Sequence, residues 1–575
     1  NMVKGMLLTI IGKYNSANNS ITASDIRLKA LEEITGITPI YSLKEGITQK
    51  SFQNYIMKAL KFYQGHIQDE VPASLLIKHH LIHKELALNL IHFPCNNDDI
   101  EEALRYLKYE EFLKFQLTMQ YIKLSRKKNI GVKKQFDQQI LTQFINQLPF
   151  KLTPDQNAAV DEIINDLKKD TIMYRFIQGD VGSGKTVVGA IGLYANYLAG
   201  FQGAMMAPTE ILASQHFKSL NILFKETGIN LALLTGRLSN KEKQNIYQDL
   251  DSGKINIVVG THALFQDKVS YQKLGLVITD EQHRFGVNQR KALKEKGQQV
   301  DFMVMSATPI PRTLAISLYG DMDVSTIKTM PTGRKKVITD VIKSHSMKPI
   351  LNNLKKYLAS GGQCYVVCPL VAESEVIDSR DTTSIYEGMK AYFKGNYEVG
   401  LLHGKMDDEV KEHIMEDFKN NQIQILVSTT VIEVGVDVSN ANWMVIYNAE
   451  RFGLSQLHQL RGRVGRGNEQ GYCYLLSNSS SKEAIERLEF LKSCHDGFEV
   501  SYYDLKVRGP GDILGNQQSG LPSLIIGDIF KDINILEVSR KDAKELLESK
   551  SNDAVYLKLI SEIEEQLINN NKYID

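Results

Sequence analysis

Apolar runs of strand length alternate with segments of helix length from Leu152 onward. In the first series the runs are rich in Val, Ile, Leu and Met: MYRFIQGD, GAMMAPT, LALLTG, INIVVGTH, LGLVITDE and DFMVMSATP. A second series follows Thr332-Gly333-Arg334: QCYVVCPL, VGLLHG, IQILVSTT, WMVIYNAE and GYCYLLSN. Such strands, separated by helices, indicate parallel sheets that are buried on both faces. The pattern predicts two tandem α/β domains, residues 151–335 and 336–478.

The flanking segments differ from these domains. Residues 1–36 hold two short β-like runs, LLTIIGKY and ITASDIRL, around a polar turn. Residues 37–150 are predicted to be helical, with a long amphipathic helix over 98–128. That helix is either a scaffold helix or, because of its basic end SRKKNIGVKK, a nucleic-acid-binding helix. The tail, 479–575, is helical and charged, with RGPGDILGNQQSG interrupting it at 508–520.

Composition limits the class of protein to a folded, multidomain one. A chain of 575 residues is expected to form roughly three to five units. Its 43% hydrophobic and 23% charged residues exclude intrinsic disorder, collagen and a coiled-coil rod. The formal charge is only +1, so a polyanion would have to be held by local basic patches. Five cysteines are too few for a disulfide framework.

The sequence gives no sign of a membrane protein. No apolar run approaches the roughly 18 residues that span a bilayer. The start, NMVKGMLLTIIGKYN, has a short apolar core and no cleavage site. We therefore expect a cytoplasmic protein without a membrane partner. Because the first residue is Asn1, we also expect the N-terminus to be a truncation.

A phosphate-binding loop is the first candidate site. The stretch Gly179, Asp180, Val181, Gly182, Ser183, Gly184, Lys185 and Thr186 fits the P-loop pattern GxxxxGK[ST], between a strand-like run and a helical one. Its backbone N–H groups and the following helix can hold phosphate oxygens. Lys185 can reach the β and γ phosphates, and the Thr186 hydroxyl is placed to bind Mg²⁺. The alternative is a chance glycine-rich turn.

Two carboxylates follow the apolar run LGLVIT. The carboxyl end of a parallel strand is where such sheets bind ligands. We expect Asp280 to hold Mg²⁺ and Glu281 to accept a proton from the attacking water. The alternative for this pair is a solvated turn.

Arginines mark the second predicted domain. QLRGRVGR, residues 459–466, holds three of them spaced by glycines. Guanidinium groups suit the charge of a transferring phosphoryl group, so Arg463 and Arg466 are candidate arginine fingers. A basic patch that binds nucleic acid is the alternative. Nucleotide bound between the two domains would hold them closed until hydrolysis, as in a motor.

Together these residues resemble a superfamily-two helicase. The sequences of the motifs are most similar to one branch, the RecG branched-DNA helicases and translocases. The resemblance runs from about residue 37 to at least residue 520. Besides GDVGSGKT, it is carried by MAPTEILASQH (206–216), GTHALFQ (260–266), DEQHRFGVNQR (280–290), SATPIPRTLA (306–315), STTVIEVGVDV (428–438) and AERFGLSQLHQLRGRVGRG (449–467). This ordered set is far more specific than a P-loop alone.

The resemblance implies further residues at the nucleotide. FKLTPDQ, residues 150–156, resembles an adenine-recognition motif in which Gln156 reads the base edge and Phe150 stacks. Gly435 and Asp437 match a motif that lies near the ribose and the arginine fingers.

The resemblance also implies coupling and DNA-facing residues. Ser306 and Thr308 resemble the element that couples hydrolysis to domain movement. His283 is expected either to hydrogen-bond Gln459 across the domain interface or to be a buried structural histidine. Segments that face the DNA backbone in such motors hold Thr209, Glu210, Gln215, Thr261, His262, Thr429 and Thr430, for each of which a cap or loop role is the alternative.

The segment from Arg508 to Gln518 resembles the translocation motif shared by RecG proteins and the transcription-repair coupling factor. In that motif a helical hairpin and a loop convert cleft closure into movement on duplex DNA. Arg487, in the preceding hairpin, belongs with Arg508 and Gln518 to its polar network. A surface loop rich in Gly and Pro is the alternative.

The implied fold is α/β. Two RecA-like domains form an ATP cleft, with a helical N-terminal region, a remnant of an OB-like wedge domain at residues 1–36, and a C-terminal helical-hairpin translocation element at 479–575. The implied activity is Mg²⁺-dependent ATP hydrolysis that drives translocation on branched duplex DNA, in fork reversal or Holliday-junction unwinding. The incomplete wedge is expected to affect junction specificity and strand separation more than hydrolysis.

Expected partners are branched double-stranded DNA and, as a further candidate, single-stranded DNA-binding protein. The protein is expected to be a monomer in a bacterial-type cytosol. Two other functions stay open. One is a transcription-repair coupling factor, although no segment has room for its polymerase-binding module. The other is a non-catalytic DNA-binding adaptor, against which the intact set of charged residues argues.

Overall fold

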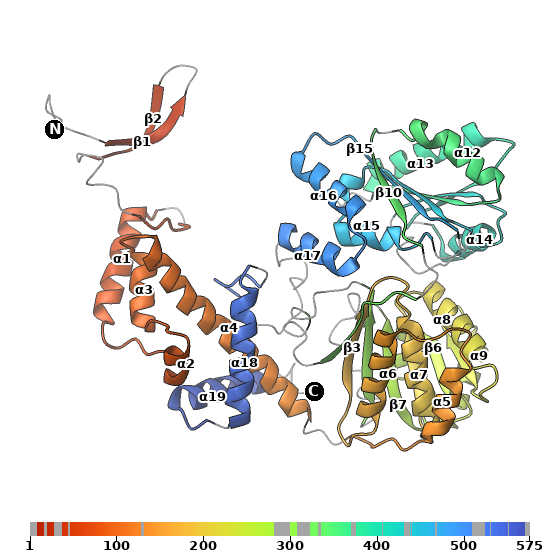
Figure 1. Ribbon diagram of the computed structural model, residues 1–575, viewed down its shortest axis with the longest axis horizontal. Coiled ribbons are helices and arrows are strands. Elements are labelled where there is room, and N and C mark those ends of the chain that lie inside the picture. Colours follow the sequence, from red (N-terminus) through yellow and green to blue (C-terminus); the bar gives the residue numbers. More distant parts are fainter. Residues whose placement is uncertain are drawn as a thin grey trace. The chain divides into compact units, whose positions relative to one another are not determined.

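The chain folds into two compact units, residues 1–120 with 521–571 and residues 121–520 with 572–575. The computed structural model describes residues 9–15, 20–27, 37–43, 46–127, 131–280, 299–307, 315, 322–331, 335–344, 346–369, 375–404, 406–429, 438, 440–465, 469–508, 524–529, 531–549 and 551–569. Figure 1 labels the elements. Within the described part, no helix combines the length and the hydropathy that crossing a bilayer requires.

The first unit is mainly helical. An antiparallel strand pair opens it: β1 (Thr9–Asn15) and β2 (Ser20–Arg27). Its helices are α1 (Gln49–Phe62), α2 (Ala73–Lys78), α3 (Lys84–His92), α4 (Asn97–Lys127), α18 (Ile533–Ser549) and α19 (Ala554–Asn569). The predicted long amphipathic helix is thus present as α4, and its last turns belong to the second unit.

A buried carboxylate joins the two ends of the chain in this unit. Asp542, on α18, accepts hydrogen bonds from Lys78 Nζ at 2.8 Å and from the Tyr109 hydroxyl at 2.6 Å, and lies 2.8 Å from His79 Nε2. The predicted region 479–575 is therefore divided: α18 and α19 pack with the N-terminal helices, and its first helices belong to the second unit.

The second unit contains two parallel sheets, each covered by helices (Figure 1). Lobe 1, residues 138–327, has the strand order β5-β6-β4-β7-β8-β3-β9. Its strands are β3 (Tyr174–Gly179), β4 (Gln202–Met206), β5 (Leu231–Leu234), β6 (Ile257–Gly260), β7 (Leu274–Asp280), β8 (Asp301–Ser306) and β9 (Asp323–Ile327). Its helices are α5 (Gln138–Asn146), α6 (Pro154–Leu167), α7 (Lys185–Leu198), α8 (Glu210–Leu223), α9 (Asn240–Asp251) and the 3₁₀ helix η2 (His262–Phe265).

Lobe 2, residues 338–508, has the strand order β10-β15-β14-β11-β13-β12. Its strands are β10 (Ile338–Lys343), β11 (Cys364–Val367), β12 (Val399–Leu402), β13 (Ile425–Ser428), β14 (Trp443–Ile446) and β15 (Tyr472–Ser477). Its helices are η4 (Lys348–Ile350), α12 (Leu351–Ala359), α13 (Glu375–Phe393), α14 (Asp408–Lys419), η6 (Ala449–Arg451), α15 (Leu454–Arg461), α16 (Lys482–Ser493) and α17 (Gly497–Arg508).

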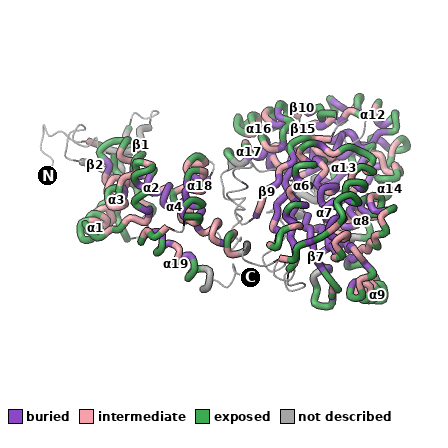
Figure 2. The backbone as a smooth tube through the Cα atoms, turned by 60° about the horizontal axis from the view of Figure 1, so that its bottom comes forward, coloured by how far each residue is buried: buried purple, intermediate pink, exposed green. Residues whose placement is uncertain are grey.

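Burial explains why the continuous apolar runs of the sequence predicted parallel strands. Every residue of β7 and β8 is buried, as Figure 2 shows in purple for much of the sheets. Both faces of these strands are covered, so the apolar residues run on without alternation. The predicted fold of two parallel-sheet domains is confirmed, since every described strand pair in both lobes is parallel.

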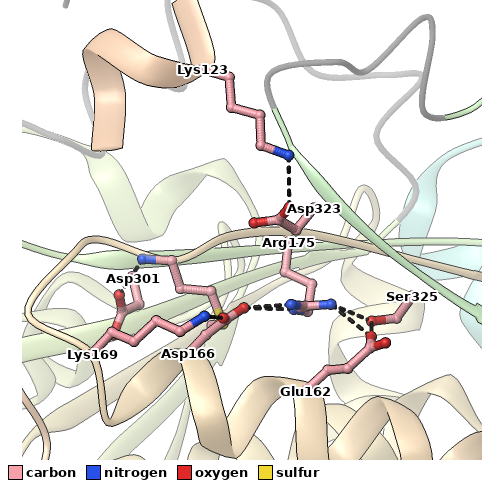
Figure 3. Close-up of polar contacts among 9 residues, drawn as sticks. Lys123, Glu162, Asp166, Lys169, Arg175, Asp301, Asp323 and Ser325 are labelled. Atoms are coloured by element: carbon pink, nitrogen blue, oxygen red, sulfur yellow. Dashed lines mark hydrogen bonds and ion pairs between the residues drawn. The ribbon is translucent and has the colours of Figure 1, made fainter. Parts of the chain in front are cut away.

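Ion pairs lie at the amino ends of the strands in the lobe 1 sheet (Figure 3). Arg175, in β3, donates to Asp166 at 2.6 and 2.8 Å and to Ser325 at 2.7 Å. Lys134 pairs with Asp301 inside the protein. This edge lies opposite the carboxyl ends of the strands, where we expected the nucleotide, so these charges hold the scaffold together.

Candidate active site

The P-loop connects β3 to α7. Gly182 and Gly184 have φ values of +79° and +85°, a region that side chains with a Cβ rarely adopt. Lys185 begins α7, and its Nζ donates to the carbonyl oxygens of Gly179 at 2.9 Å and of Asp180 at 3.0 Å. The ammonium group is thereby held over the loop, next to the helix N-terminus that would receive a phosphate.

Gln156 supports this loop from α6. Its Nε2 donates to the Ser183 carbonyl at 2.8 Å, and its Oε1 accepts from the Thr153 backbone N–H at 2.8 Å. A Cβ added to Gly184 would lie 2.2 Å from Gln156 Nε2, so the loop and the side chain are in close contact. The role of Gln156 at adenine stays a prediction, and it requires these bonds to be exchanged. Phe150 is 48% exposed, and its stacking role is also untested.

Asp280 lies at the same sheet edge as the P-loop. It ends β7 and pairs in register with Met305 of β8, whose next residue, Ser306, pairs with Gln178 of β3. His216 Nε2, on α8, lies 2.8 Å from Asp280 Oδ2. Since an ionised carboxylate only accepts hydrogen bonds, His216 is the donor.

The charge of Asp280 reflects both lobes. Burial raises the pKa of its carboxyl group, but His216, Lys185 and Arg463 together bring that pKa below the ordinary aspartate value. The Asp280 carboxylate and the half-buried Thr186 hydroxyl both lie at this edge of the sheet, and they are oxygen donors of the kind that Mg²⁺ prefers. The residues therefore fit a magnesium ion.

Lobe 2 reaches the P-loop through the arginine-rich segment. A Cβ added to Gly462 would lie 2.9 Å from Val181 Cβ, so the two backbones approach closely. The next residue, Arg463, is half-buried and contributes to the lowered pKa of the Asp280 carboxyl group. The arginine-rich segment and the P-loop therefore lie against each other, and the roles of Lys185 and Arg463 at a shared nucleotide stay predictions. Gln459, on α15, is half-buried.

Several predicted residues lie outside the described part of the chain, and their roles stay predictions: Glu281, His283, Thr308, Thr430, Gly435, Asp437, Arg466 and Gln518.

The predicted DNA-facing residues of lobe 1 have local partners. Thr209 caps α8, its hydroxyl accepting from Leu212 N–H at 3.3 Å. Glu210 accepts from Gly236 N–H at 2.7 Å and pairs with Arg237 at 2.8 Å. Arg237 also pairs with Glu412 of lobe 2.

The other predicted DNA-facing residues differ in exposure. Thr261 is buried and precedes η2, whereas His262 is exposed. Gln215 is half-buried, and Thr429 is buried directly after β13. DNA contact stays a prediction for each of them, and the exposed His262 fits it best.

The helical hairpin, which we define as α16 and α17, is the last part of lobe 2 and packs against its sheet and α15. Arg487, on α16, donates to the Phe452 carbonyl at 2.8 Å and so fixes the hairpin to the segment before α15. Arg508 is the last residue of α17. The role of the hairpin as the translocation element stays a prediction.

Sequence reasoning missed three residues at this site. His216 lies inside the motif MAPTEILASQH, and His458 and Arg461 lie beside the candidate arginine fingers. All three are buried and hydrogen-bonded to site residues or to one another. A polar residue at an apolar helical position was the available signal, but it does not name the partner.

Comparisons with known proteins match this geometry. Family models match at residues 153–316 (DEAD/DEAH box helicase), 349–468 (helicase conserved C-terminal domain) and 494–569 (ATP-dependent DNA helicase RecG, domain 3, C-terminal). A structure of RecG bound to a three-way DNA junction is similar, with a TM-score of 0.71 and 41% identity, over 92% of this chain and 70% of that one.

Two relatives named "ATP-dependent DNA helicase RecG" are similar over most of their length. The protein from Bacillus subtilis (strain 168) is 45% identical over 546 residues, 95% of this chain and 80% of that protein. The one from Staphylococcus epidermidis (strain ATCC 12228 / FDA PCI 1200) is 45% identical over 547 residues, 94% of this chain and 80% of that protein. The chain therefore belongs to the RecG family of ATP-dependent DNA helicases.

Proposed function

We propose that this RecG-family helicase hydrolyses ATP between lobe 1 and lobe 2 and thereby translocates on branched duplex DNA. The observation that carries the proposal is the close approach of the arginine-rich segment of lobe 2 to the P-loop: a Cβ added to Gly462, the residue before Arg463, would lie 2.9 Å from Val181 Cβ. The lowered pKa of the Asp280 carboxyl group, to which Lys185 and Arg463 both contribute, agrees with this placement. An arginine finger requires a cation from the second lobe at the cleft of the first lobe.

In lobe 1, Lys185 would bind the β and γ phosphates, while the P-loop N–H groups hold their oxygens. Thr186 and Asp280 would hold Mg²⁺, which when bound neutralises charge on the phosphates. Glu281 would orient the attacking water and accept its proton.

Lobe 2 would complete the site only when the lobes close. Arg463 and Arg466 would then stabilise the charge on the transferring phosphoryl group. The remaining proposed roles are adenine and ribose recognition by Phe150, Gln156, Gly435 and Asp437, and coupling by Ser306, Thr308, His283 and Gln459.

The DNA substrate follows from the family and from the similar RecG structure, which holds a three-way junction. The proposed backbone contacts are Thr209, Glu210, Gln215, Thr261, His262, Thr429 and Thr430, with Arg487, Arg508 and Gln518 in the translocation element. Binding should depend on shape more than on sequence and weaken steeply with salt. A monomeric state, a cytosolic location and binding to single-stranded DNA-binding protein remain predictions.

The test is ATP turnover with a fork, a Holliday junction, linear duplex and single-stranded DNA, compared side by side. We expect the branched substrates to stimulate most. E281Q should still bind ATP but no longer hydrolyse it. We expect the same result for R463Q. K254Q, at a lysine whose side chain is 74% exposed and which has no proposed role, is the control and should behave as the unaltered protein. Absence of turnover on every DNA would favour a non-catalytic adaptor, and wild-type turnover in E281Q would refute the assigned base.

A further inference from the structure

The P-loop is joined to the helical hairpin by side chains that the proposed nucleotide roles do not use. Asp180 Oδ1 and Oδ2 lie 2.7 and 2.9 Å from His458 Nε2. His458 Nδ1 lies 2.7 Å from an Arg461 Nη2 donor. Arg461 Nη1 donates in turn to the carbonyl oxygens of Leu491 at 2.7 Å and Cys494 at 2.8 Å. A continuous hydrogen-bond path thus leads from the P-loop to the carboxyl end of α16.

The chemistry of these groups orients the path. A guanidinium group only donates, so His458 Nδ1 accepts and its ring proton lies on Nε2, where it is donated to Asp180. Burial raises the pKa of the Asp180 carboxyl group, but the hydrogen bond from His458 brings that pKa below its ordinary value. His458 and Arg461 are 6% and 4% exposed. Breaking one bond of such a buried network leaves polar groups without partners, so its parts are expected to move together.

The second helix of the hairpin touches the same pair. α17 begins at Gly497, and a Cβ there would lie 2.8 Å from both Asp180 Oδ2 and His458 Nε2. Only glycine lets the α17 backbone come this close. The next residue, Phe498, has its ring centroid 5.7 Å from the Nζ of Lys328, which directly follows the last strand of lobe 1. The first turn of α17 is therefore in direct contact with the P-loop, whereas α16 is joined to it through Arg461 and His458.

The other end of the path is the phosphate-binding lysine. Lys185 Nζ holds the Asp180 carbonyl at 3.0 Å. A triphosphate would recruit this ammonium group to its own oxygens. The Asp180 backbone would then lose a hydrogen bond, while its side chain stays attached to His458.

We propose that His458 and Arg461 are positioning residues that couple nucleotide occupancy of the P-loop to the placement of the helical hairpin, and hence to DNA binding. The proposal rests on the proposed function of the hairpin as the translocation element. Neither residue is assigned a contact with ATP or with DNA. Their effect is on the interaction between the two ligands.

The test is a binding cycle on the full chain. The dissociation constant of a non-hydrolysable ATP analogue is measured with and without forked DNA, and that of forked DNA with and without the analogue. Thermodynamic linkage requires both ratios to be equal, and we expect about 10-fold in the unaltered protein. In H458L we expect the ratio to fall to about one, since the ligands then bind independently. A merely structural role would weaken binding without abolishing this ratio.

Three further variants make the outcome specific. H458Q should restore the ratio, because a carboxamide both donates and accepts. G497A should abolish the ratio, because the added methyl group separates Asp180 from His458 without removing either side chain. If H458L does not fold, G497A provides the test of the path. K254Q removes an exposed ion pair with Asp249 outside the path and should keep the ratio. A retained ratio in both H458L and G497A, or a lost ratio in K254Q, would overturn the proposal. Wild-type protein without DNA-stimulated turnover would instead refute the proposed function.

Discussion

His216 donates a hydrogen bond from Nε2 to Asp280 Oδ2, over 2.8 Å. His216 lies on α8, and the same helix begins at Glu210, which is predicted to face DNA and whose carboxylate accepts from Gly236 N–H and pairs with Arg237. A single rigid helix therefore connects the predicted DNA side of lobe 1 to the proposed magnesium ligand. The histidine fixes one of the two carboxylate oxygens of Asp280.

We expect H216F to lower DNA-stimulated ATP turnover by about 10- to 100-fold and to raise the Mg²⁺ concentration at half-maximal turnover, as for other residues that orient metal ligands. The phenyl ring fills the same space but donates no hydrogen bond, so Asp280 would be free to rotate. The measurement is turnover as a function of Mg²⁺ at saturating ATP and forked DNA.

H216Q is the matched variant. Its amide can donate to Asp280, so we expect it to regain much of the lost turnover. Equal defects in the two variants would mean that ring packing, and not the hydrogen bond, is what lobe 1 requires.

Lys134 and Asp301 form a buried ion pair at the opposite edge of the sheet. Lys134 Nζ also donates to the Gly275 carbonyl at 3.0 Å, and Asp301 also accepts from Met173 N–H at 2.7 Å. We expect K134M to destabilise lobe 1 by about 3 kcal/mol at neutral pH, because it leaves a buried carboxylate without its cation. The measurement is the opening free energy of β8 amides by hydrogen exchange. K133M, at the exposed neighbouring lysine, should change little.

The sign of the pH dependence follows from Asp301. Burial already raises the pKa of its carboxyl group, despite the opposing effect of Lys134. Without that cation the pKa rises further, so the folded state stays protonated while the unfolded chain ionises. The defect of K134M should therefore be smallest at acidic pH and grow as the pH rises. A defect that does not change with pH would contradict this account.

What the sequence predicted depends on how local the signal is. The P-loop is eight consecutive residues, and the strands are continuous apolar runs, so both could be found by reading along the chain. The pairing of His216 with Asp280 joins residues 64 positions apart, and that of Tyr109 with Asp542 joins residues 433 apart. No periodicity encodes such contacts, because they depend on which strands and helices become neighbours.

The arginine-rich segment shows the same limit within one motif. Glycine spacing marked Arg463 as a cleft residue, and its effect on Asp280 agrees with that position. Nothing in the spacing distinguished Arg461, which points instead to the carbonyl oxygens at the end of α16. The residue type predicted that the segment binds anionic oxygens. Only the fold shows that Arg461 contacts α16, in contrast to the cleft role predicted for Arg463.

Asp542 should stabilise the helical unit through its charge. We expect D542N to destabilise it by about 2 kcal/mol, since a buried acceptor for Lys78 and Tyr109 is weakened. The matched control is E545Q: Glu545 also pairs with Lys78, at 2.9 Å, but its side chain is 66% exposed, so we expect at most about 0.5 kcal/mol. Opening free energies of α18 amides measure both.

Acid should remove the contribution of Asp542. Burial raises the pKa of its carboxyl group, but the hydrogen bonds from Lys78, Tyr109 and His79 bring that pKa below the ordinary value of 3.8. The stabilisation is therefore fully present above pH 3.8 and is lost as the pH falls through the lower, folded-state pKa. The difference in the opening free energy of α18 amides between D542N and the unaltered protein should become smaller in that acidic range. A difference that widens there would rule out a charge-based role.

Comparing Gly184, in the P-loop, with Gly200, after α7, distinguishes the effect of backbone strain from the effect of a side-chain contact. Gly184 and Gly200 have nearly equal φ values, +85° and +80°, but a Cβ at Gly184 would meet Gln156 Nε2 at 2.2 Å, while no atom lies within 4 Å of one at Gly200. Strain alone costs about 1 kcal/mol, so we expect G200A to lose a little stability and to keep its ATP affinity. G184A must also displace Gln156 or the loop, and we expect its affinity for ATP to fall by about 10-fold or more. The measurement is equilibrium binding of a fluorescent ATP analogue to both variants. Equal affinities would show that the P-loop tolerates the added methyl group, and that the contact between Gly184 and Gln156 does not set its shape.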